Sequence, residues 1–509
     1  MNPAGISPAD RRLIVFGTLT ATMMQAIDTT IANIALPHMQ GGLSASLEQV
    51  GWILTSYLVA TAIAIMPTAY LANRFGVKRV FLISIVCFTI ASMLCGIATN
   101  LTEMVTFRFF QGVFGAALIP LAQTTLLDSH APEDQGSAMA VWGIGVIIGP
   151  IIGPVLGGLL TEHYNWRWVF YINLPIGIAS FFALSAAMPE SRARRVEPMD
   201  FLGFIFLSLA IGGLQLMLDR GQSKGWFEST EIIVECAVAV TAFYLFVVHT
   251  LTAEKPLISP GLFRDRNLLG GLVLITVIGV VLFSTYAILP PFLQNLKGYP
   301  VVTAGLVLAP RGIGTMLAMK ISAQILRHHD PRPTIWAGML LLALSLYWMS
   351  TFSLDTTPSG FVWSGFIQGM GLGFIFVPLS TLTFMTLPHK YRNDGTALYA
   401  LLRSIGSSVG IALAFAYQDY GTKMARSVLV ENINPYNPAM LDYLNANTGL
   451  LGMGSLMQIE TELQRQAAVI GMLGDFHYLF IGVFLVMPLL FLLKPGYGSR
   501  IDKTPPESV

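Results

Sequence analysis

Long apolar runs separated by short polar loops recur along the whole 509-residue chain. A run of about 20 apolar residues can cross a bilayer as an α-helix, because the helix satisfies its own backbone hydrogen bonds. We count fourteen such runs, which predicts an all-α membrane protein. The predicted spans are Leu13–Leu36, Val50–Leu71, Val80–Ala98, Met104–Leu127, Gly136–Leu160, Trp166–Met188, Phe201–Leu218, Glu231–Leu251, Asn267–Leu293, Val301–Ile325, Thr334–Phe352, Gly360–Leu387, Gly395–Tyr417 and Phe476–Leu493.

The composition agrees with a membrane protein and excludes several other classes. The chain is 54% hydrophobic and 11% charged, whereas soluble domains carry about 25% charged residues. The formal net charge is +1 and the basic residues are spread along the chain, so no nucleic-acid partner is expected. Cys87, Cys95 and Cys236 lie in apolar runs at spacings that suit neither a metal site nor a disulfide framework. We interpret them as small hydrophobic residues.

The distribution of Lys and Arg predicts the orientation of the chain. If the N-terminus is cytoplasmic, 18 of the 29 basic residues lie on the cytoplasmic side, seven lie on the opposite side and four lie within spans. Cytoplasmic loops carry the excess of Lys and Arg in membrane proteins. Both termini are therefore predicted to be cytoplasmic, as an even number of crossings requires.

An internal repeat predicts two related halves. Gln111 and Gly112 in FFQG of the fourth span match Gln368 and Gly369 in FIQG of the twelfth span. Pro120 matches Pro378 after one insertion, and Gly136 and Ala138 match Gly395 and Ala397 after one more. Parallel repeats of this kind mark transporters whose halves surround a central site. Two six-helix halves would displace the repeat by six spans. The displacement is eight spans, so we predict that two helices are inserted between two six-helix bundles.

This organisation predicts four regions of the chain. Residues 1–190 form the first bundle, and 191–260 hold a basic linker and the two inserted helices. Residues 261–495 form the second bundle and 496–509 a cytoplasmic tail. Within the second bundle, 418–475 are predicted to be a long extracytoplasmic loop ending in a helical stretch. A loop this long is usually functional or disordered, so it is either a contact surface for a partner, a partial lid, or a tolerated insertion.

Asp28 is the candidate coupling residue. It is the only charge in the first span, and by the assignments above the other 27 acidic residues fall in loops, tails or the last turns of helices. A carboxylate at the bilayer centre costs about 3 kcal/mol on insertion scales, so it persists where it is protonated, paired or facing a polar cavity. The alternative is that Asp28 only orients helix packing by hydrogen bonding to Thr29, Thr30 or Asn33.

Other polar residues within spans are weaker candidates. Arg108 could tune or respond to the charge of a carboxylate, or could bond only to backbone carbonyls. Arg311 and Arg403 lie too deep to reach the interface easily and are candidates for a cavity or gate, with structural bonding as the alternative. Gln25 and Asn33, on the same span as Asp28, are further cavity or gate candidates. Lys320 and Asp219 lie nearer helix ends, and for both we favour a role in anchoring at the membrane interface.

The fifth span carries an unusually dense run of small residues, GIGVIIGPIIGPVLGG from Gly143. Glycines four apart line one helix face and let a neighbouring backbone approach closely, while Pro150 and Pro154 are expected to kink the helix. A tight packing seam of this kind is common in membrane proteins, so the pattern alone does not define a function.

Taken together, these motifs resemble the major facilitator superfamily over essentially the whole chain. The fifth-span run resembles the antiporter signature of its exporters, at Gly145, Gly149, Pro150, Gly153, Pro154, Gly157 and Gly158. The fourth-span motif is matched at Arg108, Gln111, Gly112 and Gly115, and the loop signature at Asn73, Arg74, Gly76 and Arg79. Fourteen spans, AIDTTIANIALP around Asp28, WRWVFYINLPIG from Trp166 and LMLDRG from Leu216 are similar to the drug:proton antiporter family with fourteen helices. The loop signature departs from the family at Ala69 and Asn73, where Gly and Asp are usual, so the charge interaction of that Asp cannot be carried over.

The resemblance implies a proton-driven exporter of hydrophobic or amphipathic compounds that works by alternating access in the bacterial inner membrane, with Asp28 and Arg108 in coupling. It implies no cofactor besides the proton gradient and no metal. In a Gram-negative host it implies a periplasmic adaptor and an outer-membrane channel as partners. A dedicated transporter of one solute, by export or uptake, is the alternative. A polytopic membrane enzyme is disfavoured because the chain has no HExxH or GxxxxGK[ST] motif.

Overall fold

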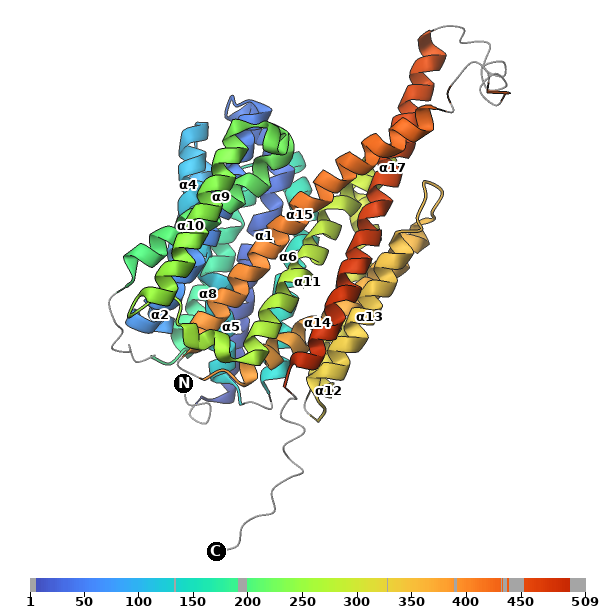
Figure 1. The fold of residues 1–509 in the computed structure, drawn as a ribbon. Helices are drawn as coiled ribbons and strands as arrows, with labels where there is room; N and C mark the ends of the chain where they lie inside the picture. Colours follow the sequence, from blue (N-terminus) through green and yellow to red (C-terminus); the bar gives the residue numbers. More distant parts are fainter. Residues whose placement is uncertain are drawn as a thin grey trace, which may run out of the picture.

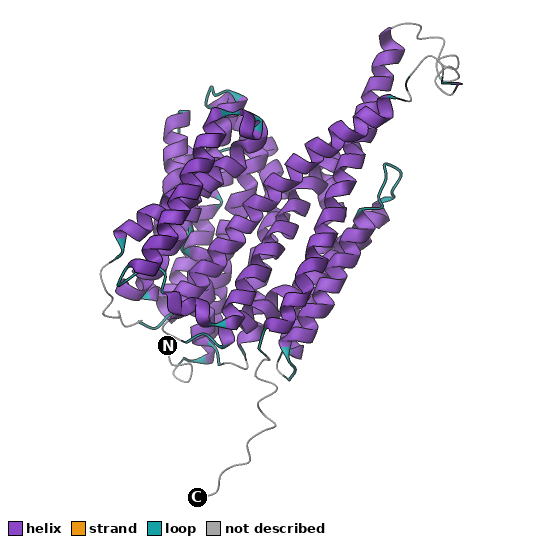
Figure 2. Ribbon diagram, in the orientation of Figure 1, coloured by secondary structure: helices purple, strands orange, loops and turns teal. Residues whose placement is uncertain are grey.

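The computed structural model describes residues 6–131, 134–190, 199–326, 328–388, 391–431, 433, 437–438 and 453–494. Within these ranges the chain is built from helices joined by short loops, with no strand (Figure 2). The helices are α1 (Pro8–Gly42), α2 (Leu47–Phe75), α3 (Val77–Ile97), α4 (Leu101–Gly115), α5 (Leu118–Ser129), α6 (Gln135–His163), α7 (Trp168–Tyr171), α8 (Asn173–Ala187), α9 (Phe201–Lys224), α10 (Thr230–Thr252), α11 (Arg266–Pro291), α12 (Val301–Ile325), α13 (Pro331–Met349), α14 (Pro358–Met385), α15 (Arg392–Val430) and α17 (Met453–Val486). Short 3-10 or π turns are η2 (Trp226–Glu228), η3 (Pro260–Arg264), η4 (Phe292–Leu296) and η7 (Met487–Leu492).

Each of the fourteen predicted spans coincides with one helix or with consecutive helical segments. Eleven helical segments among the described residues are long and apolar enough to cross a membrane. The other three predicted spans coincide with α1, α6 and α13. The protein is therefore an all-α, multi-pass membrane protein.

Local sequence explains where several of these helices begin and break. The side chain of Ser7 accepts a hydrogen bond from the Asp10 amide at the start of α1, which satisfies an otherwise free amide of the first turn. Gly76, which joins α2 to α3, has φ +93°, a conformation that L side chains rarely adopt. The fourth span divides into α4 and α5 just before Pro120, whose ring nitrogen cannot donate the next helical hydrogen bond.

The helices form two six-helix bundles with two inserted helices between them in the sequence (Figure 1). In the first bundle α1 packs against α6 and α8, and α4 packs against α2 and α3. In the second bundle α12 packs against α14, and α15 packs against α11 and α17. The inserted helices α9 and α10 pack against each other, and α9 also contacts α2 and α15. The inserted pair thus bridges the two bundles on one side.

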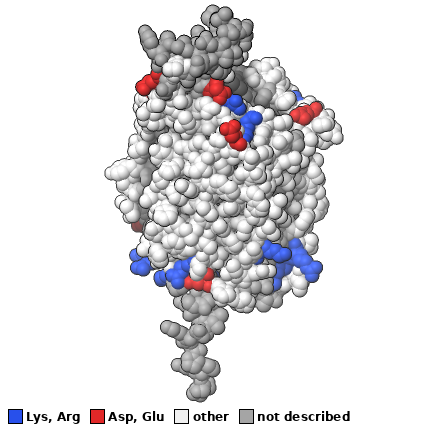
Figure 3. Space-filling model, turned by 90° about the vertical axis from the view of Figure 1, so that its right-hand side faces the viewer, with Lys and Arg blue, Asp and Glu red and all other residues white. Residues whose placement is uncertain are grey.

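The two ends of the molecule differ. Helix α1 begins and η7 ends at one end, which we call the proximal end; α15 and α17 project past the other helices at the opposite, distal end (Figure 1). On the face shown in Figure 3, Lys and Arg gather at the proximal end, and a wide band without charged residues separates them from the acidic and basic residues at the distal end. This band is what a bilayer-embedded surface requires.

The segment expected to be a long loop over 418–475 is mostly helix. Helix α15 continues to Val430 and α17 begins at Met453, so helical residues make up most of the expected loop and extend the last two spans into a projecting pair (Figure 1). The sequence ETELQRQAAV, rich in strong helix formers, explains why α17 continues unbroken from the projection into the bundle. The motif NINPYNP from Asn432 lies mainly outside the described residues.

Candidate functional site

Asp28 lies at the centre of a buried polar cluster in the first bundle. Its side chain is 0% exposed and accepts three hydrogen bonds from two other helices. Arg108 Nη1 of α4 lies 2.7 Å from Asp28 Oδ2, and Oδ1 accepts from Gln111 Nε2 and Asn173 Nδ2, each at 2.9 Å. These donors stabilise the ionised carboxylate. The alternative partners Thr29 and Thr30 instead donate to backbone carbonyls of α1, so the packing-only interpretation of Asp28 is wrong about its partners.

Arg108 is fully buried and is held on several sides. Its Nη1 also donates to Gln111 Oε1 at 2.9 Å, and its Nε donates to the Ile53 carbonyl at 3.3 Å. The guanidinium carbon lies 4.3 Å from the ring centre of Tyr57 and 5.6 Å from that of Phe170. Arg108 therefore makes a hydrogen bond to a backbone carbonyl, which was its alternative role, in addition to the ion pair with Asp28. Stacking on ring faces favours a desolvated guanidinium.

Asn173 at the start of α8 is a site residue that the sequence analysis did not single out. Its Nδ2 bridges Asp28 and the hydroxyl of Ser92 in α3, at 2.9 Å to each, and that hydroxyl donates to the Phe170 carbonyl at 2.8 Å. Asn173 lies within WRWVFYINLPIG, so an amide within an apolar span was the available signal. The cluster thus joins four helices of the first bundle to Asp28.

The charge balance of this cluster determines its chemistry. One carboxylate and one guanidinium neutralise each other in a site closed to solvent. Protonation of Asp28 would leave the cation without its counter-ion, and a buried charge without a partner is strongly unfavourable. Gain of a proton must therefore be accompanied by movement of Arg108, entry of water, or binding of another anion. An arrangement of this kind can convert proton binding into a conformational change.

The glycines of the fourth-span motif allow α4 to approach its neighbours closely. A Cβ at Gly112 would lie 2.5 Å from the Tyr57 carbonyl oxygen, and one at Gly115 would lie 3.0 Å from the Phe88 ring. The second bundle repeats the first contact, because a Cβ at Gly369 would overlap the Arg311 carbonyl oxygen. Glycine at the repeated position is thus required for close helix packing in both halves.

The glycine run of the fifth span forms the seam between α6 and α1. A Cβ at Gly145 would lie 2.8 Å from Leu19, and Cβ atoms at Gly149 and Gly153 would overlap Ala26 and Thr30. The Thr30 hydroxyl also donates to the Gly149 carbonyl at 3.1 Å. This seam therefore packs against the helix that carries Asp28.

The remaining members of the antiporter motif lie outside this contact. The carbonyl of Gly157 accepts from the Thr161 hydroxyl within α6, and a Cβ at Gly158 would meet nothing within 4 Å. Pro150 and Pro154 lie within α6, which runs unbroken from Gln135 to His163, and their side chains lie outside the described ones. The expected kinks do not break the helix.

The polar side chains that join the two bundles lie mainly toward the proximal end. Arg392 Nη1 at the start of α15 lies 2.7 Å from Asp128 Oδ1 of α5, and the hydroxyls of Thr124 and Thr396 lie 2.8 Å apart. Deeper in the same half, the rings of Trp142 and Phe376 stack with centroids 5.7 Å apart. The structure therefore represents a state in which the bundles are joined at the proximal end.

Asn73 of the loop signature also joins the two bundles at the proximal end. It accepts a hydrogen bond from Asn393 at 2.6 Å and donates to Asp394 at 3.3 Å, so the residue that replaces the usual Asp still connects the two bundles. The rest of the signature is local to the first bundle. Arg74 donates to Tyr70, Gly76 makes the α2–α3 joint, and exposed Arg79 lies 4.0 Å from Glu190.

The cavity or gate candidates occupy different environments. Arg311 is 3% exposed and stacks on Tyr286 at 4.4 Å, and its Nε and Nη2 have no partner among the described residues. Arg403 is half-buried within α15. Gln25 is buried, with its Oε1 unpartnered in the described part of the chain, whereas Asn33 is exposed and is not part of the Asp28 cluster.

The sequence did not indicate that a second carboxylate, Asp475, is buried. Asp475 is 4% exposed and lies at the middle of the candidate span Met457–Leu492, because α17 extends through the segment expected to be a loop. Its Oδ2 has no partner among the described residues. Asp475 directly precedes the predicted span Phe476–Leu493, and the 36-residue helical segment is longer than one crossing needs, so the expectation that Asp28 is the only carboxylate near the middle of a span stays a prediction. In the described part of the chain, no group of three His, Cys, Asp or Glu side chains could hold a metal ion.

Two helical bundles, an internal repeat and a buried ion pair between helices of one bundle define a multi-pass membrane transporter. The sequence model of the Major Facilitator Superfamily matches residues 18–411, and the chain belongs to this family. It is therefore a transporter and not an enzyme.

Similar proteins and structures place the chain more finely. It is 35% identical over 491 residues to the multidrug export protein EmrB of Escherichia coli (strain K12), covering 94% of each chain. It is 33% identical over 483 residues to the fatty acid resistance protein FarB of Neisseria gonorrhoeae, covering 94% of this chain and 95% of that one. The solved structure of the proton:xylose symporter XylE matches with a TM-score of 0.59 at 14% identity, over 82% of this chain and 90% of that chain. The last similarity concerns the fold alone.

Proposed function

We propose that this protein is a proton-driven multidrug exporter that moves hydrophobic or amphipathic compounds by alternating access. The buried pair of Asp28 and Arg108 carries this proposal, since it is a protonatable site whose charge state must alter the packing of α1 and α4. The similarity to EmrB over nearly the full chain supports multidrug export rather than transport of sugars.

The mechanism follows from the charge balance of the cluster. In the state with the proximal end closed, Asp28 is ionised and paired with Arg108. A proton that reaches Asp28 from the distal side removes the negative charge and weakens three of the hydrogen bonds that join α1, α4 and α8. The bundles then rock to open the proximal end, where Asp28 loses its proton and substrate binds. Inward proton flow in each cycle drives outward movement of substrate.

The proposal includes an orientation and a location. The proximal end, with its excess of Lys and Arg and the start of α1, faces the cytoplasm of a bacterial cell, and the protein lies in the inner membrane. Both termini are then cytoplasmic. The projecting helices α15 and α17 reach into the extracytoplasmic space, where in a Gram-negative host an EmrA-like adaptor and a TolC-like outer-membrane channel complete the path.

The test is efflux of a hydrophobic dye from proteoliposomes of known orientation under an imposed proton gradient. Asp28→Asn keeps the size of the side chain but cannot release a proton. We expect the gradient-driven efflux rate to fall by about tenfold or more, within the range of 5- to 150-fold that coupling free energies of 1–3 kcal/mol produce. Dye binding should be retained.

Asp219→Asn is the matched control. Asp219 is a carboxylate within α9 that accepts a hydrogen bond from the Thr55 hydroxyl and is not among the hydrogen-bond partners of the Asp28 carboxylate, so its variant should keep gradient-driven efflux. Unimpaired efflux in Asp28→Asn would remove Asp28 from coupling. If the unmodified protein moved no cationic or neutral dye under a proton gradient, the dedicated transport of one solute would replace multidrug export.

A further inference from the structure

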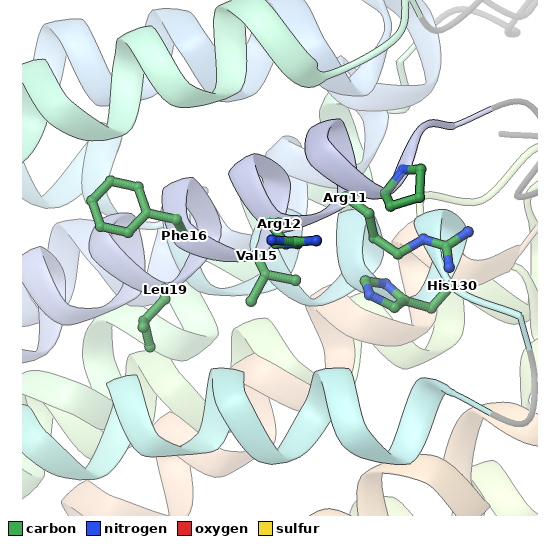
Figure 4. A pocket seen from close by; sticks show the side chains of 7 residues that line it. Arg11, Arg12, Val15, Phe16, Leu19 and His130 are labelled. Atoms are coloured by element: carbon green, nitrogen blue, oxygen red, sulfur yellow. The ribbon is translucent and has the colours of Figure 1, made fainter.

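A cleft of about 490 Å³ lies over the first three turns of α1, away from the Asp28 cluster. Its lining comes from Pro8, Arg11, Arg12, Val15, Phe16 and Leu19 of α1 and from His130, which follows α5 (Figure 4). The cleft runs along the seam with α6, because Leu19 is the side chain that faces Gly145. It belongs to no part of the proposed transport path.

The cleft is graded from polar to apolar along the helix axis. Arg11 and His130 lie at its proximal end, Arg12 lies beside Val15, and Phe16 and Leu19 follow deeper along α1 (Figure 4). At a rise of 1.5 Å per residue, Arg11 and Leu19 are about 12 Å apart along the axis. This distance matches the step from a phospholipid headgroup to the upper part of its acyl chains, given headgroup layers of about 5–8 Å on each side of the hydrocarbon core.

The surroundings of the cleft face lipid and not protein. Arg12 is exposed, and Leu13 and Phe16 are 40% and 48% exposed. In a chain that spans a membrane, apolar side chains exposed at this depth contact acyl chains. Leu13 and Phe16 therefore mark the cleft as open to the bilayer.

The charge in the cleft comes from the arginines. Burial, helped by the nearby Arg11, lowers the pKa of His130 below its usual value against the opposing effects of the Leu126 carbonyl and Asp134, so the imidazole is neutral at neutral pH. Its Nδ1 is engaged by Ser129 and the Leu126 carbonyl, at 3.0 Å each, which leaves the other ring nitrogen as the remaining polar atom of this residue. Two cations and one neutral imidazole suit a phosphodiester better than a cation or a neutral headgroup.

We propose that this cleft binds one anionic phospholipid of the surrounding leaflet. The phosphate lies between Arg11 and Arg12, and one acyl chain follows Val15, Phe16 and Leu19 along α1. Basic pockets between helices at the cytoplasmic side of a membrane protein recognise lipid headgroups by this combination of charge and apolar depth. The proposal does not rest on the exported substrate or on proton coupling.

The experiment measures lipid binding to the purified full-length protein in mild detergent, by native mass spectrometry and by the shift of the melting temperature. Phosphatidylglycerol is the probe and phosphatidylcholine of the same chain length is the neutral comparison. The double variant Arg11→Gln/Arg12→Gln should bind phosphatidylglycerol about tenfold or more weakly, given about 1 kcal/mol for each basic residue near an anionic surface. Phosphatidylcholine binding should change little.

Arg264→Gln/Arg266→Gln is the matched control. Both arginines are exposed at the proximal end, beside the start of α11, and their removal changes the net charge equally. Phosphatidylglycerol binding by this variant should stay within about twofold of that by the unmodified chain. An equal loss in both double variants would overturn the proposal in favour of general surface charge.

Two further probes separate a lipid from a free anion. Inorganic phosphate and glycerophosphoglycerol, which carry the charge without acyl chains, should neither stabilise the protein nor compete with phosphatidylglycerol at millimolar concentration. Arginine-dependent stabilisation by either probe would make the cleft a site for soluble anions and would refute the lipid assignment. The melting temperature of each variant without added lipid shows whether it is folded.

Discussion

At the scale of single residues, the two bundles treat buried cations differently. Arg108 in the first bundle has a carboxylate at 2.7 Å. Arg311 in the second has the Tyr286 ring face, and two of its nitrogens lack partners among the described residues. Gln368 corresponds to Gln111 in the repeat. Gln111 donates a hydrogen bond to Asp28, whereas Gln368 donates one to the hydroxyl of Thr285. At this repeated position the glutamine therefore meets an acid in the first half and a hydroxyl in the second.

This difference predicts opposite effects on stability. Arg108→Met leaves Asp28 buried without its counter-ion and should destabilise the protein by about 3–5 kcal/mol. Arg311→Met removes a buried cation without a carboxylate partner and should raise the melting temperature, by an amount equivalent to about 2 kcal/mol. Thermal unfolding in mild detergent measures both. A similar fall for both variants would mean that Arg311 holds the second bundle together.

At the scale of helices, the seam between α1 and α6 connects the antiporter motif to the coupling site. Gly149 packs against Ala26, two residues before Asp28, and Gly153 packs against Thr30, two residues after it. Any movement of α1 that follows protonation must therefore occur along the glycine face of α6. Small residues serve this purpose because they allow backbone contact without interlocking side chains.

Alanine substitutions along α6 test this seam. Gly149→Ala should destabilise the protein by about 1–3 kcal/mol, since the added methyl group overlaps backbone atoms of α1. Gly158→Ala adds the same group where nothing lies within 4 Å, and should be neutral or stabilising by up to about 1 kcal/mol, because alanine is the better helix former. Melting temperatures of the pair give the measurement. Equal effects would show that the seam tolerates an added methyl group.

At the scale of the whole molecule, polar contacts between the bundles concentrate at the proximal end. The ion pair of Asp128 and Arg392 and the hydrogen bonds of Asn73 join elements more than 250 residues apart in sequence. A transporter that alternates between two states must break these contacts to open this end. Their strength therefore sets how often the proximal end opens.

Asp128→Asn weakens this closure and should shift the protein toward the proximal-open state. A loss of one or two kcal/mol changes the ratio of the two states by about 5- to 30-fold. Spin labels at exposed positions 190 and 328, in a variant without Cys87, Cys95 and Cys236, report the distance between the bundles, which should lengthen. Lys423→Gln breaks an exposed pair with Asp419 within α15 and should leave the distance unchanged. A distance unaffected by Asp128→Asn would show that this ion pair does not control closure.

Much of the architecture follows from local sequence. Apolar run length predicts all fourteen spans, because each helix in lipid must satisfy its own hydrogen bonds and reach across the same thickness. The same reasoning identifies Asp28 and Arg108 as costly and therefore informative residues. It expects a long loop over 418–475 with a helical stretch near its end, whereas α15 and α17 make most of this segment helical.

The sequence by itself determined that the chain crosses the membrane repeatedly, that its halves are related and which charged side chains lie within it, because these properties depend on hydropathy and repetition along the chain. Only the tertiary structure decided that Arg108 pairs with Asp28, that Asn173 and Gln111 complete the cluster, and that Arg311 stacks on Tyr286 without a carboxylate beside it. Those contacts join residues up to 145 positions apart, and they depend on how helices pack and rotate about their axes, which hydropathy does not encode.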